Sequence, residues 1–189
     1  MTRYLTPVLN PIDTANGLPN AHYSSQAMFE AESDPLWFSN WAGLCIEAEL
    51  AEPGDAKPFD FLGVPLFAMR SKDGQVRVFQ NVCRHRGMIL VSEPRRIEGA
   101  IRCPYLSWCY DLTGKLKTTP HVGGPGQNTH ADVDRDDLGL IEIRSHVWQD
   151  IVFVNVSGKA PPFEEAASGV LERWKEFEHP AYFGGADSA

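Results

Sequence analysis

The chain has 189 residues, 43% of them hydrophobic and 22% charged, and its formal net charge is −8. This length suits one folded domain with a short appendage and is sufficient to bury a hydrophobic core. No basic stripe accompanies the acidic balance, which argues against a nucleic-acid surface, because binding phosphates requires clustered positive charge. No hydrophobic run approaches the roughly 18 residues of a membrane-spanning helix.

The first twenty residues contain one arginine and several prolines and asparagines, and they lack the hydrophobic stretch of a secretory signal. We therefore expect a cytoplasmic protein. Thiols stay reduced in that compartment, so the four cysteines are expected to be metal ligands or core residues rather than disulfides.

The N-terminal part predicts an arm followed by a short helix. Residues 1–22 contain three prolines and are expected to be extended. Ser24 and Ser25 are placed to cap a helix over Gln26–Ser33, in a capping-box arrangement. Pro35 is expected to end or restart that helix.

From Leu44 onward the hydrophobic pattern is that of β-strands separated by Gly, Asn and Asp turns. The predicted strands are Leu44–Leu50, Phe59–Leu62, Val64–Arg70, Val76–Asn81, Ile89–Val91, Gly99–Arg102, Trp108–Leu112, Lys115–Lys117, Leu140–Trp148 and Ile151–Val156. Hairpin turns are expected at Lys72–Gln75, Thr113-Gly114 and Gln149-Asp150.

A long loop over 119–137 and a C-terminal helix over Phe163–Glu178 complete the prediction. The expected fold is mainly β, antiparallel, with short helices at both ends. The expected divisions are 1–42 (arm and helix), 43–158 (β domain) and 159–189 (C-terminal helix).

Two short motifs carry the chemistry. Cys83 and His85 offer a thiolate and an imidazole one residue apart, and Cys103 offers a second thiolate after residues 86–102. A two-iron, two-sulfide cluster with mixed ligands takes Cys-x-His from one loop and Cys-x-x-His from another, and the imidazoles raise its reduction potential. The chain matches this pattern except that Leu106 stands where the second histidine belongs.

These motifs resemble the N-terminal portion of the α subunit of a Rieske non-haem iron oxygenase. The similar stretches are Cys83 to Gly87, Asn81-Val82, Cys103-Pro104-Tyr105, Trp108, Tyr110 to Gly114, Val147 to Gly158 and Tyr23 to Trp41. The resemblance covers nearly the whole chain and implies a Rieske-type antiparallel β domain whose tip holds a [2Fe–2S] cluster in two loops.

The resemblance also implies a role for each ligand and a set of partners. Cys83 and Cys103 would hold the inner iron and His85 the outer iron. Electrons would arrive from a reductase or ferredoxin and pass to a mononuclear iron that activates O₂ for hydroxylation or demethylation. The family also implies a homotrimer, and the acidic charge would suit a basic electron-transfer partner.

Two departures from the family limit the function that we expect. Leu106 has no lone pair for a metal, so the cluster is expected to be incomplete or absent. The sequence is compatible with a natural loss, an engineered change or a sequence error at this position. The family's mononuclear iron domain is not expected within these residues; it would lie on another chain or have been removed, so the chain is not expected to act alone.

The other candidate ligands have simpler interpretations. Cys45 and Cys109 are expected to pack inside strands. His121 and His130, in the 119–137 loop, are not expected to replace the missing ligand. The acidic residues Asp132, Asp134, Asp136 and Asp137 lack the glycine and glutamate spacing of a calcium loop and are expected to be solvated.

Three hypotheses therefore remain open. The first is the Rieske electron-transfer module, an oxidoreductase component. The second is a cluster-free Rieske-like module used for assembly or regulation. The third is a mononuclear zinc or iron site on Cys83, His85 and Cys103, with water as the fourth ligand.

Overall fold

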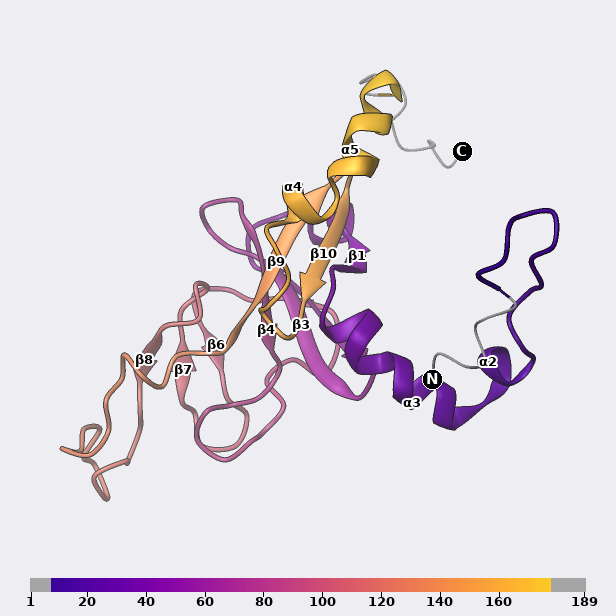
Figure 1. The fold of residues 1–189 in the computed structure, drawn as a ribbon. Coiled ribbons are helices and arrows are strands. Elements are labelled where there is room, and N and C mark those ends of the chain that lie inside the picture. Colours follow the sequence, from indigo (N-terminus) through magenta and orange to yellow (C-terminus); the bar gives the residue numbers. More distant parts are fainter. Residues whose placement is uncertain (1–7, 178–189) are drawn as a thin grey trace.

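Two antiparallel sheets form the body of the computed structural model, which describes residues 8–177 (Figure 1). The seven-stranded sheet has the order β1-β10-β9-β4-β3-β2-β5, and the three-stranded sheet has the order β6-β7-β8. The strands of the large sheet are β1 (Ala42–Ile46), β2 (Asp55–Phe61), β3 (Val64–Arg70), β4 (Val76–Gln80), β5 (Arg95–Arg96), β9 (Glu142–Trp148) and β10 (Ile151–Asn155). Those of the small sheet are β6 (Ile101–Arg102), β7 (Cys109–Tyr110) and β8 (Leu116–Thr118). The prediction of a mainly β, antiparallel fold is confirmed.

Short helices lie at both ends of the chain, as expected (Figure 1). The N-terminal helical segments are α2 (Ala21–Ser24), α3 (Gln26–Glu32) and the π-helical η1 (Ser33–Phe38). The later ones are the 3-10 turn η2 (Glu47–Leu50), then α4 (Phe163–Ala166), α5 (Ser168–Trp174) and the 3-10 turn η3 (Lys175–Phe177). No helix among residues 8–177 is long and hydrophobic enough to cross a membrane.

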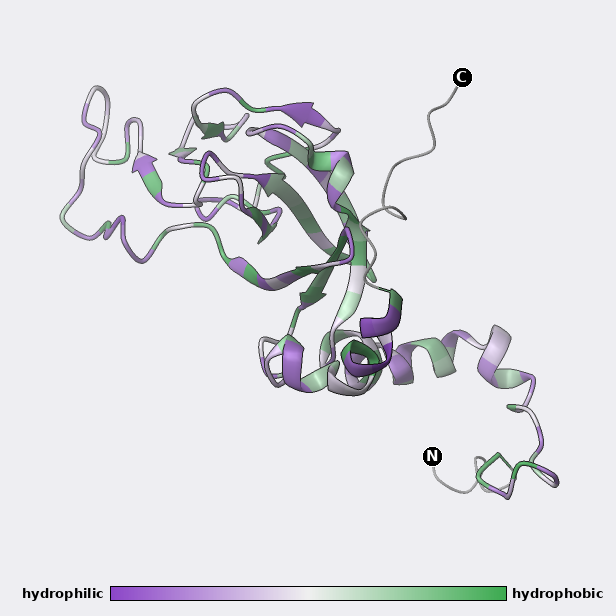
Figure 2. Ribbon diagram, turned by 90° about the horizontal axis from the view of Figure 1, so that it is seen from above, coloured by the Kyte–Doolittle hydropathy of each residue, from purple (hydrophilic) through white to green (hydrophobic). Residues whose placement is uncertain are grey.

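Two clusters of buried hydrophobic residues form the core. One contains Leu50, Leu66, Val78, Val152 and Val154 from the large sheet and its edge. The other joins the large sheet to the small one, and it includes two residues of the predicted metal site, Cys83 and Cys103, together with Phe67, Phe79, Ile101, Trp108 and Tyr110. Figure 2 shows the hydrophobic residues concentrated along the central strands, whereas the long 119–137 loop is mostly hydrophilic. The bases of the two motif loops, with their cysteines, are thus packed into a core.

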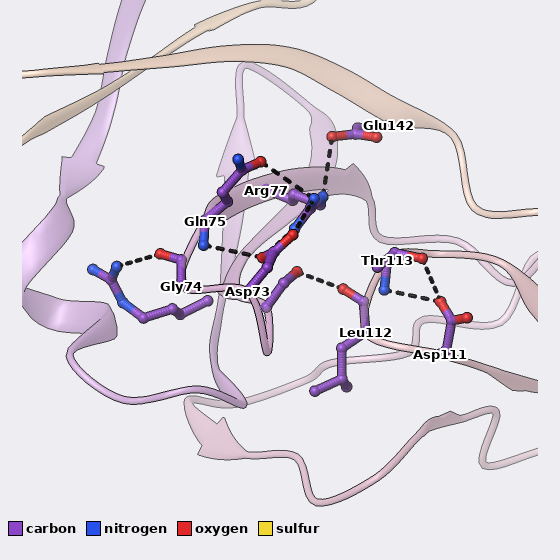
Figure 3. Close-up of polar contacts among 10 residues, drawn as sticks. Asp73, Gly74, Gln75, Arg77, Asp111, Leu112, Thr113 and Glu142 are labelled. Carbon is purple, nitrogen blue, oxygen red and sulfur yellow. Dashed lines mark hydrogen bonds and ion pairs between the residues drawn. The ribbon is translucent and has the colours of Figure 1, made fainter.

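Polar contacts join the β3–β4 turn to the turn that follows β7 (Figure 3). Arg77 forms a bidentate ion pair with Asp73 at 2.9 and 2.7 Å, which ties the β3–β4 turn to the start of β4. The buried Ser71 hydroxyl donates to the Leu112 carbonyl at 2.6 Å, and Asp111 accepts from Thr113. The small sheet is therefore fixed to the large sheet by hydrogen bonds as well as by the core.

The observed elements differ from the predicted ones in several details. Ser25 is the N-cap of α3 but makes no side-chain cap hydrogen bond, and the expected capping box is wrong. Residues 47–50 form a 3-10 turn rather than continuing β1. Ile89–Val91 is not a strand, because the Asn81 side chain takes its backbone groups. The predicted C-terminal helix breaks at Ala167, whose φ of −96° and ψ of 5° interrupt the helix; its expected end at Glu178 lies outside the described residues.

Candidate metal centre

The two motif loops have the same backbone design. In the first, the Cys83 N–H donates to the Met88 carbonyl at 2.8 Å and the Gly87 N–H donates to the Cys83 carbonyl at 3.0 Å. In the second, the Cys103 N–H donates to the Trp108 carbonyl at 2.8 Å and the Ser107 N–H donates to the Cys103 carbonyl at 3.1 Å. Each loop is therefore a closed turn that begins with its cysteine.

A left-handed residue completes each turn four positions after the cysteine. Gly87 has φ of 72° and Ser107 has φ of 57°. Glycine adopts this conformation without steric cost, which explains the glycine of the first motif, whereas Ser107 adopts it with some strain. The similarity of the two turns means that the loops present their side chains in comparable ways.

The buried Asn81 side chain closes the base of the first loop. Its Nδ2 donates to the Val91 carbonyl at 2.6 Å, and its Oδ1 accepts from the N–H groups of Leu90 and Val91 at 3.1 and 2.9 Å. One amide therefore satisfies three backbone groups that would otherwise be buried without partners. The sequence placed Asn81 only beside the motif and did not predict this role.

The two motif cysteines are buried at the bottom of the loops. Cys83 and Cys103 are each only 2% exposed, and both belong to the core cluster shared by the sheets. Burial raises the pKa of the Cys83 thiol, and the neighbouring Cys103 adds to this effect. Two thiols so placed need a cation, or protons, to offset the cost of burying their charge.

His85 lies at the rim of the same site. Its ring is stacked on the buried indole of Trp108, with centroids 4.5 Å apart and planes at 9°. Burial lowers the pKa of His85, and the positive charge of Arg86 lowers it further. Both effects favour the neutral imidazole, which is the form that binds a metal.

The tip of the second loop is exposed and hydrophobic where a fourth ligand would be expected. Tyr105 is 57% exposed and Leu106 is 41% exposed, and Met88 on the first loop is 43% exposed. No hydrogen bond can involve the Leu106 side chain. Of the four positions of the Cys-x-His and Cys-x-x-His pattern, three therefore carry donor atoms.

This donor set fits a [2Fe–2S] group in part. Two buried thiols in twin turns suit one iron, and the neutral, stacked His85 suits the second, which lacks its other imidazole. Within residues 8–177, no three His, Cys, Asp or Glu side chains come together tightly enough to hold a single ion.

Tyr110, the second residue of β7, is a part of the site that the sequence analysis did not identify. Its hydroxyl lies 3.3 Å from Cys83 Sγ and accepts the Arg84 N–H at 3.1 Å. Burial raises the pKa of Tyr110 above its usual range, and the Cys83 contact raises it further, so the hydroxyl keeps its proton. When Cys83 is a thiolate, Tyr110 must be the donor. The sequence offered only a weak signal, an aromatic residue in the strand after the second loop.

We expect Tyr110→Phe to lower the reduction potential of a cluster in this site. A hydrogen bond to a ligand sulfur stabilises the more negative, reduced state. A loss of about 1.4 kcal/mol corresponds to about 60 mV for one electron. Voltammetry of the variant measures this shift, with the exposed Tyr105→Phe as a control that should leave the potential unchanged. Equal potentials for Tyr110→Phe and the parent would show that the hydroxyl does not act on the sulfur.

The remaining cysteines lie in strands, as predicted. Cys109 in β7 is buried, and its Sγ donates to the Ser107 carbonyl at 3.2 Å. Cys45 in β1 packs against the large-sheet cluster, and burial, with help from Glu49, raises its pKa to about 11.

Cys45 is therefore expected to react slowly with alkylating reagents. Because the thiolate is the nucleophile, a pKa near 11 predicts about 100-fold slower alkylation by iodoacetamide at pH 8 than for the same thiol in the unfolded chain. Peptide mass spectrometry of Cys45 at timed intervals, with and without guanidinium, tests this. Similar rates in both conditions would contradict the prediction.

The histidines of the long loop make local contacts. His121 Nδ1 accepts the Gly126 N–H at 3.0 Å, and His130 Nδ1 accepts the Asp132 N–H at 3.2 Å. His146 stacks on Phe163 with ring centroids 4.2 Å apart, and His22 Nδ1 lies 3.3 Å from Glu32. His179 lies outside the described residues. These contacts give each described histidine away from the site a structural role.

Comparison with known proteins places this site in a family. Residues 40–134, about half of the chain, match the family model of the Rieske [2Fe–2S] domain. The fold is similar to that of a quaternary ammonium Rieske monooxygenase solved with γ-butyrobetaine, with a TM-score of 0.75 and 27% identity over 86% of this chain and 45% of that one. Naphthalene 1,2-dioxygenase with bound indole gives a TM-score of 0.64 and 26% identity, covering 76% of this chain and 32% of that one.

Curated relatives agree with these matches. The chain is 29% identical to the carnitine monooxygenase oxygenase subunit of Acinetobacter baumannii (strain ATCC 19606), over 87% of this chain and 43% of the relative. It is 30% identical to the 2-aminobenzenesulfonate 2,3-dioxygenase α subunit of Alcaligenes sp., over 93% and 45% respectively. The chain thus spans less than half the length of these relatives. It belongs to the Rieske [2Fe–2S] domain family, in the form found in the α subunits of Rieske oxygenases.

Proposed function

We propose that this chain supplies the electron-transfer part of a ring-hydroxylating or demethylating oxygenase, with a cluster site that lacks one protein ligand. Cys83 and Cys103 would hold the inner iron and His85 the outer iron, and Leu106 would give the outer iron no ligand. The proposed divisions of the chain are 1–42, 43–158 and 159–189, with the cluster in the second.

The observation that carries this proposal is the pair of matching turns. Each begins with a buried cysteine and is closed by the same two backbone hydrogen bonds. Paired cysteine turns also hold single tetrahedral metals, but the mixed thiolate and imidazole pattern and the match to the Rieske [2Fe–2S] domain favour a cluster shared between the two loops. The Cys-x-x-His spacing of the second motif puts the fourth ligand three residues after Cys103, where Leu106 stands.

A [2Fe–2S] group would supply one-electron chemistry at this tip. Cys83 and Cys103, at 2% exposure, provide thiolates away from water. Trp108 packs flat against His85 and holds its ring in place, and the Tyr110 hydroxyl donates a hydrogen bond to Cys83 Sγ. These residues orient the ligands and limit the access of water, which otherwise hydrolyses exposed iron.

The partners in this proposal are a reductase or ferredoxin as electron donor and a mononuclear iron centre outside residues 1–189 as acceptor. The matched relatives, named as monooxygenase and dioxygenase subunits, support this role. A homotrimer is the assembly that we expect from the family.

Metal and sulfide analysis of the anaerobically purified protein tests the proposal. We expect iron and acid-labile sulfide in equal amounts, with visible absorption and an EPR signal on reduction. One zinc per chain and no colour would favour the mononuclear alternative. Complete absence of metal after reconstitution with iron and sulfide would favour the cluster-free module.

A further inference from the structure

The arginines of this acidic chain are concentrated around the cluster loops. Residues 84–102 contain five arginines and two glutamates, although the whole chain carries a net charge of −8. All five arginine side chains are exposed: Arg84, Arg86, Arg95, Arg96 and Arg102. The loops that hold the predicted ligands therefore carry positive charge, contrary to what the overall balance suggests.

Three of these arginines line one groove beside the second loop. The groove has a volume of about 280 Å³, and Arg95, Arg96 and Arg102 form it together with Pro104, the residue directly after Cys103. Glu98 is the acidic residue among its lining side chains. The groove is thus positive and touches the loop of a cluster ligand.

The arginines of this groove differ in how firmly they are held. Arg95 Nη2 donates to the Leu90 carbonyl at 2.8 Å, which fixes it to the base of the first loop. Arg96 pairs with Asp55 at 2.9 Å through its Nε. Within residues 8–177, no hydrogen bond or ion pair is found for the Arg102 guanidinium. Arg102 is therefore free to meet an external carboxylate, and Arg95 is already positioned.

We propose that this arginine groove, defined by Arg95, Arg96, Arg102 and Pro104, docks the acidic face of an iron–sulfur electron donor. This inference rests on the proposed function, and it specifies where the electron donor binds and which charge its binding surface carries. Positive charge beside a ligand loop raises the rate of encounter with an acidic protein. Because electron transfer weakens steeply with distance, a donor docked beside Pro104 is well placed to reduce the cluster.

The chemistry of the surrounding surface fits such a contact. Arginine, tyrosine and methionine are enriched at protein interfaces, and Tyr105 and Met88 are exposed near the groove and on the facing loop. Transient redox complexes use small interfaces, for which a shallow charged groove is sufficient. The partner is therefore expected to be acidic, in place of the basic partner that the net charge alone suggested.

Binding of an oxidised, acidic plant-type [2Fe–2S] ferredoxin tests the inference. The full chain, Arg102→Glu and Arg96→Glu/Arg102→Glu are titrated by calorimetry at low and at physiological ionic strength. We expect the double variant to bind about tenfold or more weakly at low ionic strength and to lose most of the salt dependence. Arg102→Gln, which leaves the exposed site uncharged, is expected to fall between the parent and Arg102→Glu.

A matched control has the same change of charge away from the groove. Lys159→Glu/Arg173→Glu alters two exposed side chains beside α4 and on α5, which lie at the other end of the molecule from β6 (Figure 1). This variant should bind within about twofold of the parent, and thermal melting should show that all variants are folded. Equal weakening in the groove and control variants, or binding that does not respond to salt, would overturn the inference.

The calorimetric titration needs no electron transfer, so it separates this inference from the proposed function. Salt-dependent binding that the groove substitutions abolish supports the docking surface even when the chain never accepts an electron. In that case stopped-flow reduction by the same ferredoxin would fail for the parent, and only the proposed function would be rejected.

Discussion

Replacing Leu106 with histidine is expected to restore the fourth ligand and to stabilise the cluster strongly. Position 106 is the fourth-ligand position of the Cys-x-x-His spacing, so an imidazole there is expected to bind the outer iron. Removing a residue that hydrogen-bonds to a metal ligand typically lowers the affinity for the metal by about 10- to 100-fold. Adding a ligand should therefore slow the loss of iron to a chelator by about 100-fold or more. Leu106 is 41% exposed, and the substitution should leave the melting temperature of the metal-free chain nearly unchanged.

Iron and sulfide content, the rate of bleaching by a chelator and the EPR spectrum measure this effect. Tyr105→His is the matched control, since it places an imidazole one residue earlier in the same exposed turn. It should not stabilise the cluster. Leu106→Ala should behave like the parent. If Leu106→His loses iron as fast as Tyr105→His, the assignment of position 106 as the vacant ligand position is wrong.

Replacing Asn81 with leucine is expected to destabilise the fold and also to release the cluster. The substitution leaves two buried N–H groups and one carbonyl of residues 90 and 91 without partners. A loss of about 3 kcal/mol is expected, which corresponds to a fall in melting temperature of about 6–12 °C for a chain of this size. Because Asn81 closes the first ligand loop, Cys83 and His85 should also lose their fixed positions.

Asn155→Leu provides a matched control for Asn81→Leu. Asn155 is also fully buried, and its side chain also makes three backbone contacts, to Phe38, Asn40 and Ala160, away from the ligand loops. Thermal melting should show a similar loss for both variants, whereas iron content at a temperature where both are folded should fall only for Asn81→Leu. Equal iron contents would mean that Asn81 stabilises the domain without positioning the ligands.

The strands could be predicted largely from the sequence because their signals are local. Val64–Arg70 coincides with β3, and the Gln149-Asp150 turn has positive φ at both residues, as a tight hairpin requires. The sequence did not predict the ends of β1 or the two-residue strand β5. The 3-10 turn after β1 and the edge pairing of β5 both depend on residues that are distant in the sequence. In the β5–β2 pairing, Arg95 lies opposite Ala56 and Arg96 lies opposite Asp55. A pairing between such distant residues cannot be read from a local sequence pattern.

The motif cysteines and histidine could be named from spacing, but their surroundings could not. Cys83, His85 and Cys103 are recognisable because ligand chemistry restricts which residues occur at those positions. Asn81, Tyr110 and the arginine groove have no such restriction, since each depends on contacts that form only when the chain folds: Asn81 closes its own loop on Leu90 and Val91, and Tyr110 reaches Cys83 from the small sheet. Tyr110 meets Cys83 across 27 positions of the chain.

The sequence by itself therefore identified the family and most of the strands, and it named three candidate donor residues and the leucine in the fourth position of the motif. These features depend on residue type and on short spacings between residues, both of which can be read directly from the sequence. Only the tertiary structure shows that the two loops have the same turn conformation and that the Tyr110 hydroxyl faces the Cys83 thiol. It also shows that three arginines lie together beside the second loop. Those features are contacts between separate segments, and their energies exist only once the sheets have packed.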